Sequence, residues 1–184
     1  MKLEKKEEHK YAKMAMRQYL SIITLNVNRL NAVIKRHRIA QRIRNHESNI
    51  CYLQQTHIRA RDVHRLKAKV WKQICQAHGQ EKKAKVSILI SVKIDFTKRA
   101  LKGDLEGHFI MLKGRVHQED IHIVNICAPK IGAPKYIKKI LEDFKKDIDS
   151  NTIIVGDFNT PLSKMDRSSK QNINKDIAAL NNVL

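Results

Sequence analysis

Six short runs rich in isoleucine, valine and leucine, separated by polar and basic segments, constrain the fold of this chain most. Each run is about as long as one β-strand, and β-branched residues are favoured in buried strands. Helical patterns stand between some of these runs, so the sequence predicts an α/β or α+β fold of one domain. The runs cover residues 21–27, 49–53, 85–92, 108–116, 120–128 and 151–159.

Three segments have the residue spacing of helices. A basic stretch that follows the first run and ends near Asn45 has Val33, Ile39 and Ile43 as its expected inner residues. Pro134 opens the clearest helix, which carries an apolar stripe, and a further stripe lies at the end of the sequence. The two stripes are Ile137, Ile140, Leu141, Phe144 and Ile148, and then Ile173, Ile177, Leu180 and Leu184.

The 184 residues include 37 lysines and arginines against 18 aspartates and glutamates, a formal charge of +19. Such an excess attracts polyanions, and the commonest cellular polyanion is nucleic acid. The expected partner is therefore a DNA or RNA backbone bound without sequence preference, although a generally adhesive basic surface would have the same composition. No apolar run is long enough to cross a membrane, so we expect no membrane partner. Composition indicates no protein partner.

The first twenty residues and the cysteines bear on the cellular compartment. Residues 1–20 mix both charge signs without an apolar core, which predicts a frayed or disordered leader and no secretory signal. Cys51, Cys75 and Cys127 are odd in number and lack the paired spacing of zinc sites, so we expect free thiols in an intracellular protein. The basic stretches are compatible with a nuclear location, but they would serve DNA binding equally well.

The string IIVGDFNTP (153–161) carries the clearest chemical signal. A buried strand that ends in Gly-Asp-Phe-Asn directs Asp157 and Asn159 to the same side, because alternate side chains of a strand do so. The carboxylate could hold a hard cation or orient a water, and the amide could contact a phosphate oxygen. A turn in which these side chains bond the backbone would explain the same residues.

Two further strand ends carry polar residues. The string ITLNVNRLN (23–31) places Asn26 where its amide could contact a metal-bound water or a phosphate, and the alternative is an asparagine that satisfies a turn. The string YLQQTHIRARDVHRLK (52–67) places Gln55, Thr56 and His57 at a strand end, before a basic, helix-like stretch. By itself the second string indicates only a polar loop and a solvated basic face.

Together and in this order, these strings resemble the endonuclease domain of mammalian long interspersed (LINE-type) retrotransposons. That domain belongs to the endonuclease/exonuclease/phosphatase superfamily, with apurinic-site endonucleases, exonuclease III and deoxyribonuclease I. The resemblance implies a four-layer sandwich of two β-sheets flanked by helices, and Mg²⁺-dependent hydrolysis of phosphodiester bonds in DNA. It spans residues 21–184 almost without gaps and rests on TLNxN, xLQxTH, NIxAP (125–129) and GDFNTPLSxxDR (156–167).

The resemblance also implies roles for three residues. Asn26, Asp157 and Asn159 would be the catalytic residues and would take part in holding Mg²⁺. Asp157 would orient or deprotonate the attacking water, and Asn159 would donate a hydrogen bond to the phosphate. The metal ion would neutralise charge on the phosphate and on the leaving oxygen.

Several positions depart from the family pattern. Gln55 stands where the family has a metal-binding glutamate, and Cys127 stands where it has a tyrosine whose hydroxyl bonds near the phosphate. Arg29 and Lys85 stand where the family has glycines, and a long cationic side chain is a poor substitute for glycine at a tight turn or in a closely packed strand. The family domain also continues into a Ser-Asp-His string that these residues lack. We therefore expect a C-terminally truncated, marginally stable sandwich without detectable catalysis.

Three functional hypotheses remain. The first is an inactive remnant of a retrotransposon endonuclease. The second is a binding module that keeps a basic surface for phosphate contacts. The third, which the lost residues oppose, is a working Mg²⁺-dependent DNA nuclease. The basic residues expected to bind nucleic acid are Arg36, Arg38, Arg59, Arg61 and Arg65.

Overall fold

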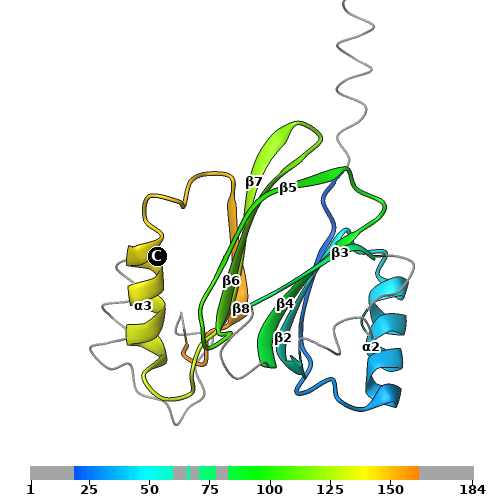
Figure 1. The fold of residues 1–184 in the computed structure, drawn as a ribbon, viewed down its shortest axis with the longest axis horizontal. Coiled ribbons are helices and arrows are strands. Elements are labelled where there is room, and N and C mark those ends of the chain that lie inside the picture. Colours follow the sequence, from blue (N-terminus) through cyan, green and yellow to red (C-terminus); the bar gives the residue numbers. More distant parts are fainter. Residues whose placement is uncertain (1–18, 60–65, 67–70, 78–82, 162–184) are drawn as a thin grey trace, which may run out of the picture.

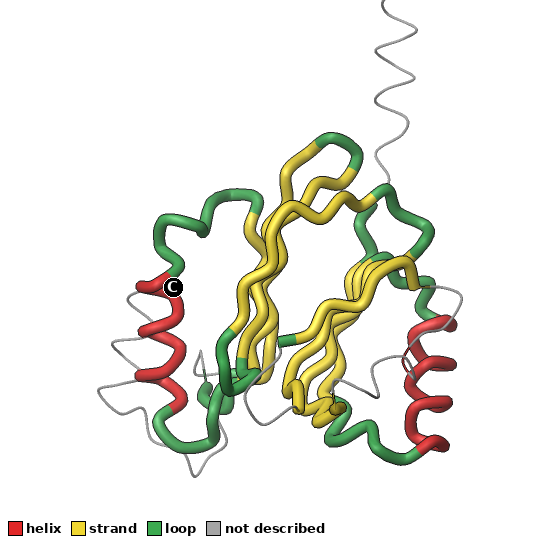
Figure 2. The backbone as a smooth tube through the Cα atoms, viewed as in Figure 1, coloured by secondary structure: helices red, strands yellow, loops and turns green. Residues whose placement is uncertain are grey.

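The two predicted sheets lie face to face, with one helix on the outer side of each (Figure 1). The computed structural model describes residues 19–59, 66, 71–77 and 83–161. Within these residues the layers follow in the order α2 (Val33–Asn45), first sheet, second sheet and α3 (Ala133–Asp143), as the backbone tube of Figure 2 also shows. This arrangement confirms the predicted α/β sandwich of two sheets flanked by helices.

The first sheet has four strands in the order β1-β2-β4-β3. β1 pairs in parallel with β2, and β4 pairs antiparallel with both β2 and β3. The parallel pair brings two carboxyl-terminal strand segments together, so that Asn26 lies opposite Gln54. The strands are β1 (Ile22–Asn26), β2 (Ile50–Arg59), β3 (Trp71–Gln76) and β4 (Lys83–Ser91).

The second sheet has four strands in the order β5-β6-β7-β8. Its first three strands form antiparallel pairs, whereas β7 and β8 are parallel. The parallel pairing places Cys127 opposite Asp157, at the ends of the two strands. The strands are β5 (Phe96–Gly103), β6 (Phe109–Val116), β7 (Glu119–Cys127) and β8 (Thr152–Asp157).

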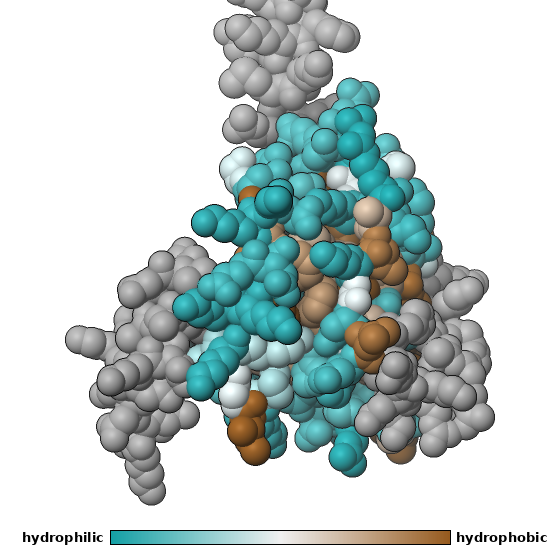
Figure 3. All heavy atoms as spheres, turned by 60° about the vertical axis from the view of Figure 1, so that its left-hand side comes forward, coloured by the Kyte–Doolittle hydropathy of each residue, from teal (hydrophilic) through white to brown (hydrophobic). Residues whose placement is uncertain are grey.

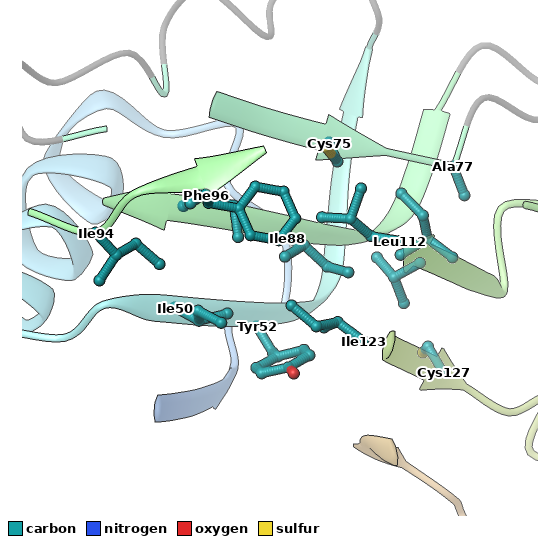
Figure 4. Packing of buried hydrophobic residues seen from close by; sticks show 13 residues of the cluster. Ile50, Tyr52, Cys75, Ala77, Ile88, Ile94, Phe96, Leu112, Ile123 and Cys127 are labelled. Carbon is teal, nitrogen blue, oxygen red and sulfur yellow. The ribbon is translucent and has the colours of Figure 1, made fainter. Parts of the chain in front are cut away.

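Apolar side chains from both sheets fill the space between them (Figure 4). Ile50 and Ile88 from the first sheet and Leu112 and Ile123 from the second are completely buried in this layer. Tyr52 is also completely buried here, and its hydroxyl has no hydrogen-bond partner among the described residues. This shared core fixes the two sheets against each other and thereby positions the strand ends that carry the polar motifs.

The two outer helices are packed to different extents. α3 covers the second sheet and buries Ala133, Ile137, Ile140 and Leu141, but it ends at Asp143, so the last two residues of the predicted stripe, Phe144 and Ile148, lie beyond the helix. α2 buries only Ile43. Val33, expected on the inner face, is 56% exposed, because a spacing of six residues from Ile39 turns it to another side of the helix. No helix in the described part of the chain has the length and apolar character needed to span a bilayer.

All six predicted runs form strands, but two strands were not predicted. β3 and β5 contain several polar or basic residues, and β5 is exposed along most of its length, so neither shows an uninterrupted apolar run. β2 continues to Arg59, so the first residues of the predicted basic, helix-like stretch are extended instead. The three cysteines are free and buried, as predicted. The expected helix over 173–184 and residues 1–18 of the expected leader lie outside the described residues.

Candidate active site

The ends of β1 and β8 meet across the two sheets. Asn26 and Asp157 are the last residues of these strands, and the Asn26 side-chain amide donates a hydrogen bond of 2.8 Å to Asp157 Oδ2. The two residues are 131 positions apart in the sequence. The structure therefore brings together two of the side chains that the strand-end motifs single out.

Gln55 joins the same carboxylate from β2. Its Nε2 donates to Asp157 Oδ2 at 2.8 Å, so one oxygen accepts two amide protons. Gln55 has a φ of 54°, His57 has a φ of 49°, and the pairing of β2 with β4 is irregular between Gln54 and Ile58. Left-handed backbone at residues other than glycine is strained and concentrates at functional sites. We call Asn26, Gln55 and Asp157 the outer bridge.

Asn159 lies beside the outer bridge, in the turn that follows β8. Its backbone N–H donates to Asp157 Oδ1 at 3.3 Å, and its side-chain amide donates to the Ala128 carbonyl at 2.7 Å. In the same way, the Asn28 backbone N–H donates to Asn26 Oδ1 at 3.2 Å. These are the side chain-to-backbone turns that the sequence left open as an alternative. Asn26, Asp157 and Asn159 therefore shape their own turns as well as meeting at one place.

Cys127, at the family's tyrosine position, lies next to the outer bridge in the interior. It is 5% exposed and pairs with Asp157 between β7 and β8. Burial raises the pKa of its thiol, and the nearby charge of Asp157 raises it further, whereas the Gln55 backbone and Lys85 lower it. The net shift is upward, so the thiol stays protonated near neutral pH and is a weak nucleophile.

A second polar group lies deeper between the sheets, and the sequence motifs did not predict it. Gln54 Nε2 donates to Asn125 Oδ1 at 2.9 Å and to Thr24 Oγ1 at 3.0 Å. Asn125 Nδ2 donates to the carbonyls of Leu53 and Ser87 at 3.1 and 3.0 Å. We call Gln54 and Asn125 the inner bridge; Thr24, which bonds Gln54 at its edge, is exposed. Gln54 and Asn125 stand in the strings xLQxTH and NIxAP, so a signal was present, but those strings indicated no role for either residue.

Lys85 and His108 form a third polar group behind Cys127. The ammonium of Lys85 contacts His108 Nε2, and His108 Nδ1 lies 2.7 Å from the Cys127 carbonyl. Because a carbonyl only accepts, His108 Nδ1 is the donor in the bond to Cys127. His108 is 6% exposed, and the ring of Tyr136 lies beside it at 5.5 Å between centroids.

The predicted nucleic-acid-binding arginines have different environments. Arg38 is exposed on α2, whereas Arg36 is half-buried and its Nη1 donates to the Leu30 and Asn31 carbonyls at 2.8 and 2.6 Å. The side chain of Arg59, and all of Arg61 and Arg65, lie outside the described residues. Figure 3 shows one face of the molecule, where hydrophilic side chains predominate around a smaller hydrophobic patch.

The outer bridge is a poor match for a hard divalent cation. Both oxygens of Asp157 already accept hydrogen bonds from N–H groups, and Gln55 and Asn26 supply no negative charge. Throughout the described ranges, no three side chains of histidine, cysteine, aspartate or glutamate gather in a way that could hold a metal ion. Magnesium binds through carboxylates and gives up its water reluctantly. The donors present are better suited to hydrogen bonding than to magnesium coordination.

Three solved structures share this fold at low sequence identity. The endonuclease domain of TRAS1, a telomere-specific non-LTR retrotransposon, is 14% identical, with a TM-score of 0.63 over 90% of this chain and 69% of that one. An AP endonuclease from Archaeoglobus fulgidus is 17% identical, with a TM-score of 0.65 over 90% and 69%. D. rerio TDP2, complexed with a single-strand DNA product, is 12% identical, with a TM-score of 0.62 over 88% and 64%.

No family model matches the chain. At identities of 12–17% the comparisons establish the fold, and the chain spans 64–69% of the length of these three structures. The chain therefore has the same α/β sandwich fold as these three structures.

Proposed function

We propose that this chain is a degenerate derivative of a retrotransposon endonuclease that has lost Mg²⁺-dependent hydrolysis of DNA. The observation that carries this proposal is the double amide donation from Asn26 and Gln55 to Asp157 Oδ2. An amide proton and a metal ion compete for the same oxygen lone pairs. A divalent ion that displaced these amide groups would be bound by a single carboxylate, whereas the resemblance implies a site with two carboxylates.

Replacing Gln55 by glutamate tests the proposal. Gln55→Glu puts a second carboxylate beside Asp157, so Mg²⁺ affinity measured by calorimetry should rise by roughly tenfold or more. Gln55→Ala is the matched control, because it removes the competing amide protons without adding charge. Equal magnesium affinity in the wild type and Gln55→Glu would contradict the proposal that the lost carboxylate disables the site.

Cleavage is the direct readout. The wild-type protein should leave supercoiled plasmid intact in the presence of magnesium, because the site has one carboxylate and no tyrosine hydroxyl at Cys127. Asp157→Ala controls for a contaminating nuclease. Magnesium-dependent nicks that disappear in the Asp157→Ala protein would show that the chain is a working nuclease.

A binding module is the second candidate function, favoured by the surface of α2. This helix contains no acidic residue, and Arg38, Arg42 and Arg44 are exposed on it. Exposed cations on one element can track a phosphate backbone without reading its sequence. The solved TDP2 structure with a single-strand DNA product is an example of nucleic acid bound by a protein of this fold.

Salt dependence of binding tests the second candidate. Arg38→Gln combined with Arg42→Gln should reduce the log–log salt slope for duplex DNA by about 0.9 for each lost phosphate contact. Lys139→Gln, on the exposed side of α3, is the control and should leave the slope unchanged. Weak binding with a flat salt dependence in the wild type would exclude a backbone-binding module.

A further inference from the structure

A pocket lies between α2 and the outer face of the first sheet, which this helix covers (Figure 1). Its volume is about 500 Å³, within the range of small-molecule sites in proteins. Its floor is apolar and deeply buried, since Leu30, Leu53 and Leu89 are at most 1% exposed. Further apolar side chains in its lining are Ile39, Ile43 and Trp71.

The sequence of α2 explains why the helix leaves this space. Residues 36, 39, 40 and 43 share one face of a helix, because they follow the spacing of three and four residues. Ile39 and Ile43 carry large apolar side chains toward the sheet, but Ala40 is small. Arg36 donates from Nη1 to two carbonyls of the loop before the helix, at 2.8 and 2.6 Å. Two of the four positions on this face therefore do not fill the layer.

The polar groups at the pocket carry positive charge and no negative charge. They all come from α2, and among the described residues that line the pocket none is acidic. Arg36 is half-buried and held in place by its two backbone bonds, whereas Arg44 is exposed. A guanidinium beside an apolar surface suits a carboxylate, which accepts hydrogen bonds from its N–H groups. The polar lining residues are Arg36, His37, Gln41 and Arg44.

We propose that this pocket binds a free aliphatic monocarboxylate, with its alkyl chain on the leucine floor and its carboxylate at Arg36 and Arg44. An alkyl chain suits the floor because it gains from leaving water and needs no hydrogen-bond partner. A nucleotide base would leave polar atoms unpaired against leucines. No bond is made or broken. The pocket contains no residue of the outer bridge, so the inference is independent of the function proposed above.

Trp71 provides the readout, because it is the single tryptophan of the chain and lines the pocket. Titration with octanoate should shift its fluorescence saturably to shorter wavelength as the alkyl chain replaces solvent around the indole. Hexanoate should bind roughly tenfold more weakly, because it is shorter by two CH₂ groups. Octanol, which has the same chain without the charge, should also bind roughly tenfold more weakly.

Three variants locate the site. Arg44→Met should weaken octanoate binding by up to about fivefold, the effect of an exposed charge, and leave octanol binding unchanged. Ala40→Phe places a large side chain in the pocket and should abolish the response to both ligands. Lys139→Met removes an equal charge from α3 and should leave both affinities unchanged. Thermal unfolding checks that each variant is folded.

Several results would overturn the inference. One is the absence of a saturable response to octanoate, and another is equal affinity for octanoate and octanol or for octanoate and hexanoate. Octanoate binding that persists in folded Ala40→Phe would overturn the location. Adenosine monophosphate that bound as tightly as octanoate would overturn the aliphatic class. If Ala40→Phe does not fold, the wild-type affinities for the three aliphatic ligands decide.

Discussion

The inner and outer bridges join the same two sheets through polar side chains, yet they differ in how far those side chains are buried and in whether their hydrogen-bonding groups can also reach solvent. In the inner bridge, Gln54 and Asn125 are 2% and 0% exposed and bond only the protein. In the outer bridge, Asn26 is exposed and Gln55 and Asp157 are partly exposed. Gln54 and Gln55 are adjacent in the sequence and both reach the second sheet, but Gln54 bonds Asn125 in the interior and Gln55 bonds Asp157 at the partly exposed strand end.

The difference shows that hydrogen bonds between the two sheets can be a folding requirement at one place and a replaceable polar surface at another. Buried polar groups cost free energy unless they are bonded, so the inner bridge must be complete for the sheets to close. The outer bridge is open to solvent, so its members can change with little cost to folding. This contrast predicts that position 55 tolerates substitution more readily than position 54.

The largest effect should come from breaking the inner bridge. Asn125→Leu removes the buried partner of the Gln54 amide, which keeps only Thr24, and takes one side-chain donor from each of the carbonyls of Leu53 and Ser87. The free energy of unfolding should therefore fall by about 3 kcal/mol or more. Asn26→Leu makes the same change in the outer bridge and should cost less than about 1 kcal/mol. Equal losses in urea unfolding would show that the two bridges do not differ.

Gly156→Ala tests whether the outer bridge depends on close strand packing. A Cβ at Gly156 would lie 2.1 Å from the Ile126 carbonyl oxygen, so β7 and β8 must separate, at a cost of about 1–3 kcal/mol. The shift would also move Asp157 away from Gln55. Gly132→Ala is the control, because its Cβ meets nothing within 4 Å and the cost comes from its φ of 74° alone. Urea unfolding of both variants measures the difference.

Tyr52→Phe should strengthen the inner layer. The Tyr52 hydroxyl is buried without a partner among the described residues, and burial raises its pKa, so the group is neutral and unsatisfied. Removing it should raise the free energy of unfolding by about 1 kcal/mol, with no change in nucleic-acid binding. A loss of stability would indicate that the hydroxyl has a bonded partner, such as an ordered water.

The smallest effect should come from Arg29→Gly, beside the outer bridge. Arg29 has a φ of 67°, and its backbone N–H donates to the Gln55 carbonyl at 2.7 Å. Glycine relieves about 1 kcal/mol or more of left-handed strain but gains freedom in the unfolded chain, so the net stabilisation should be about 0.5 kcal/mol. A stable variant with weaker DNA binding would assign Arg29 to binding instead.

Much of the fold could be predicted from local pattern. Uninterrupted apolar runs identified six strands, and the stripe after Pro134 identified α3, because burial imposes those periodicities. β3 and β5 escaped prediction because their polar and basic residues leave no such run. The inner bridge was not predicted, because a buried asparagine such as Asn125 can be identified as part of a polar group only from its hydrogen-bond partners. Those partners lie 38–72 residues away in the sequence.

The strand-end motifs, the positive charge and the residues at positions 29, 55, 85 and 127 can be read from the amino-acid sequence, because they are properties of residue type and order. The folded chain was needed to show that Asn26 and Gln55 share one oxygen of Asp157, and that Lys85 contacts His108, which in turn contacts the Cys127 carbonyl. The reason is that hydrogen bonds and charges act over a few ångströms, and distances between strands of different sheets are set by packing rather than by separation along the chain.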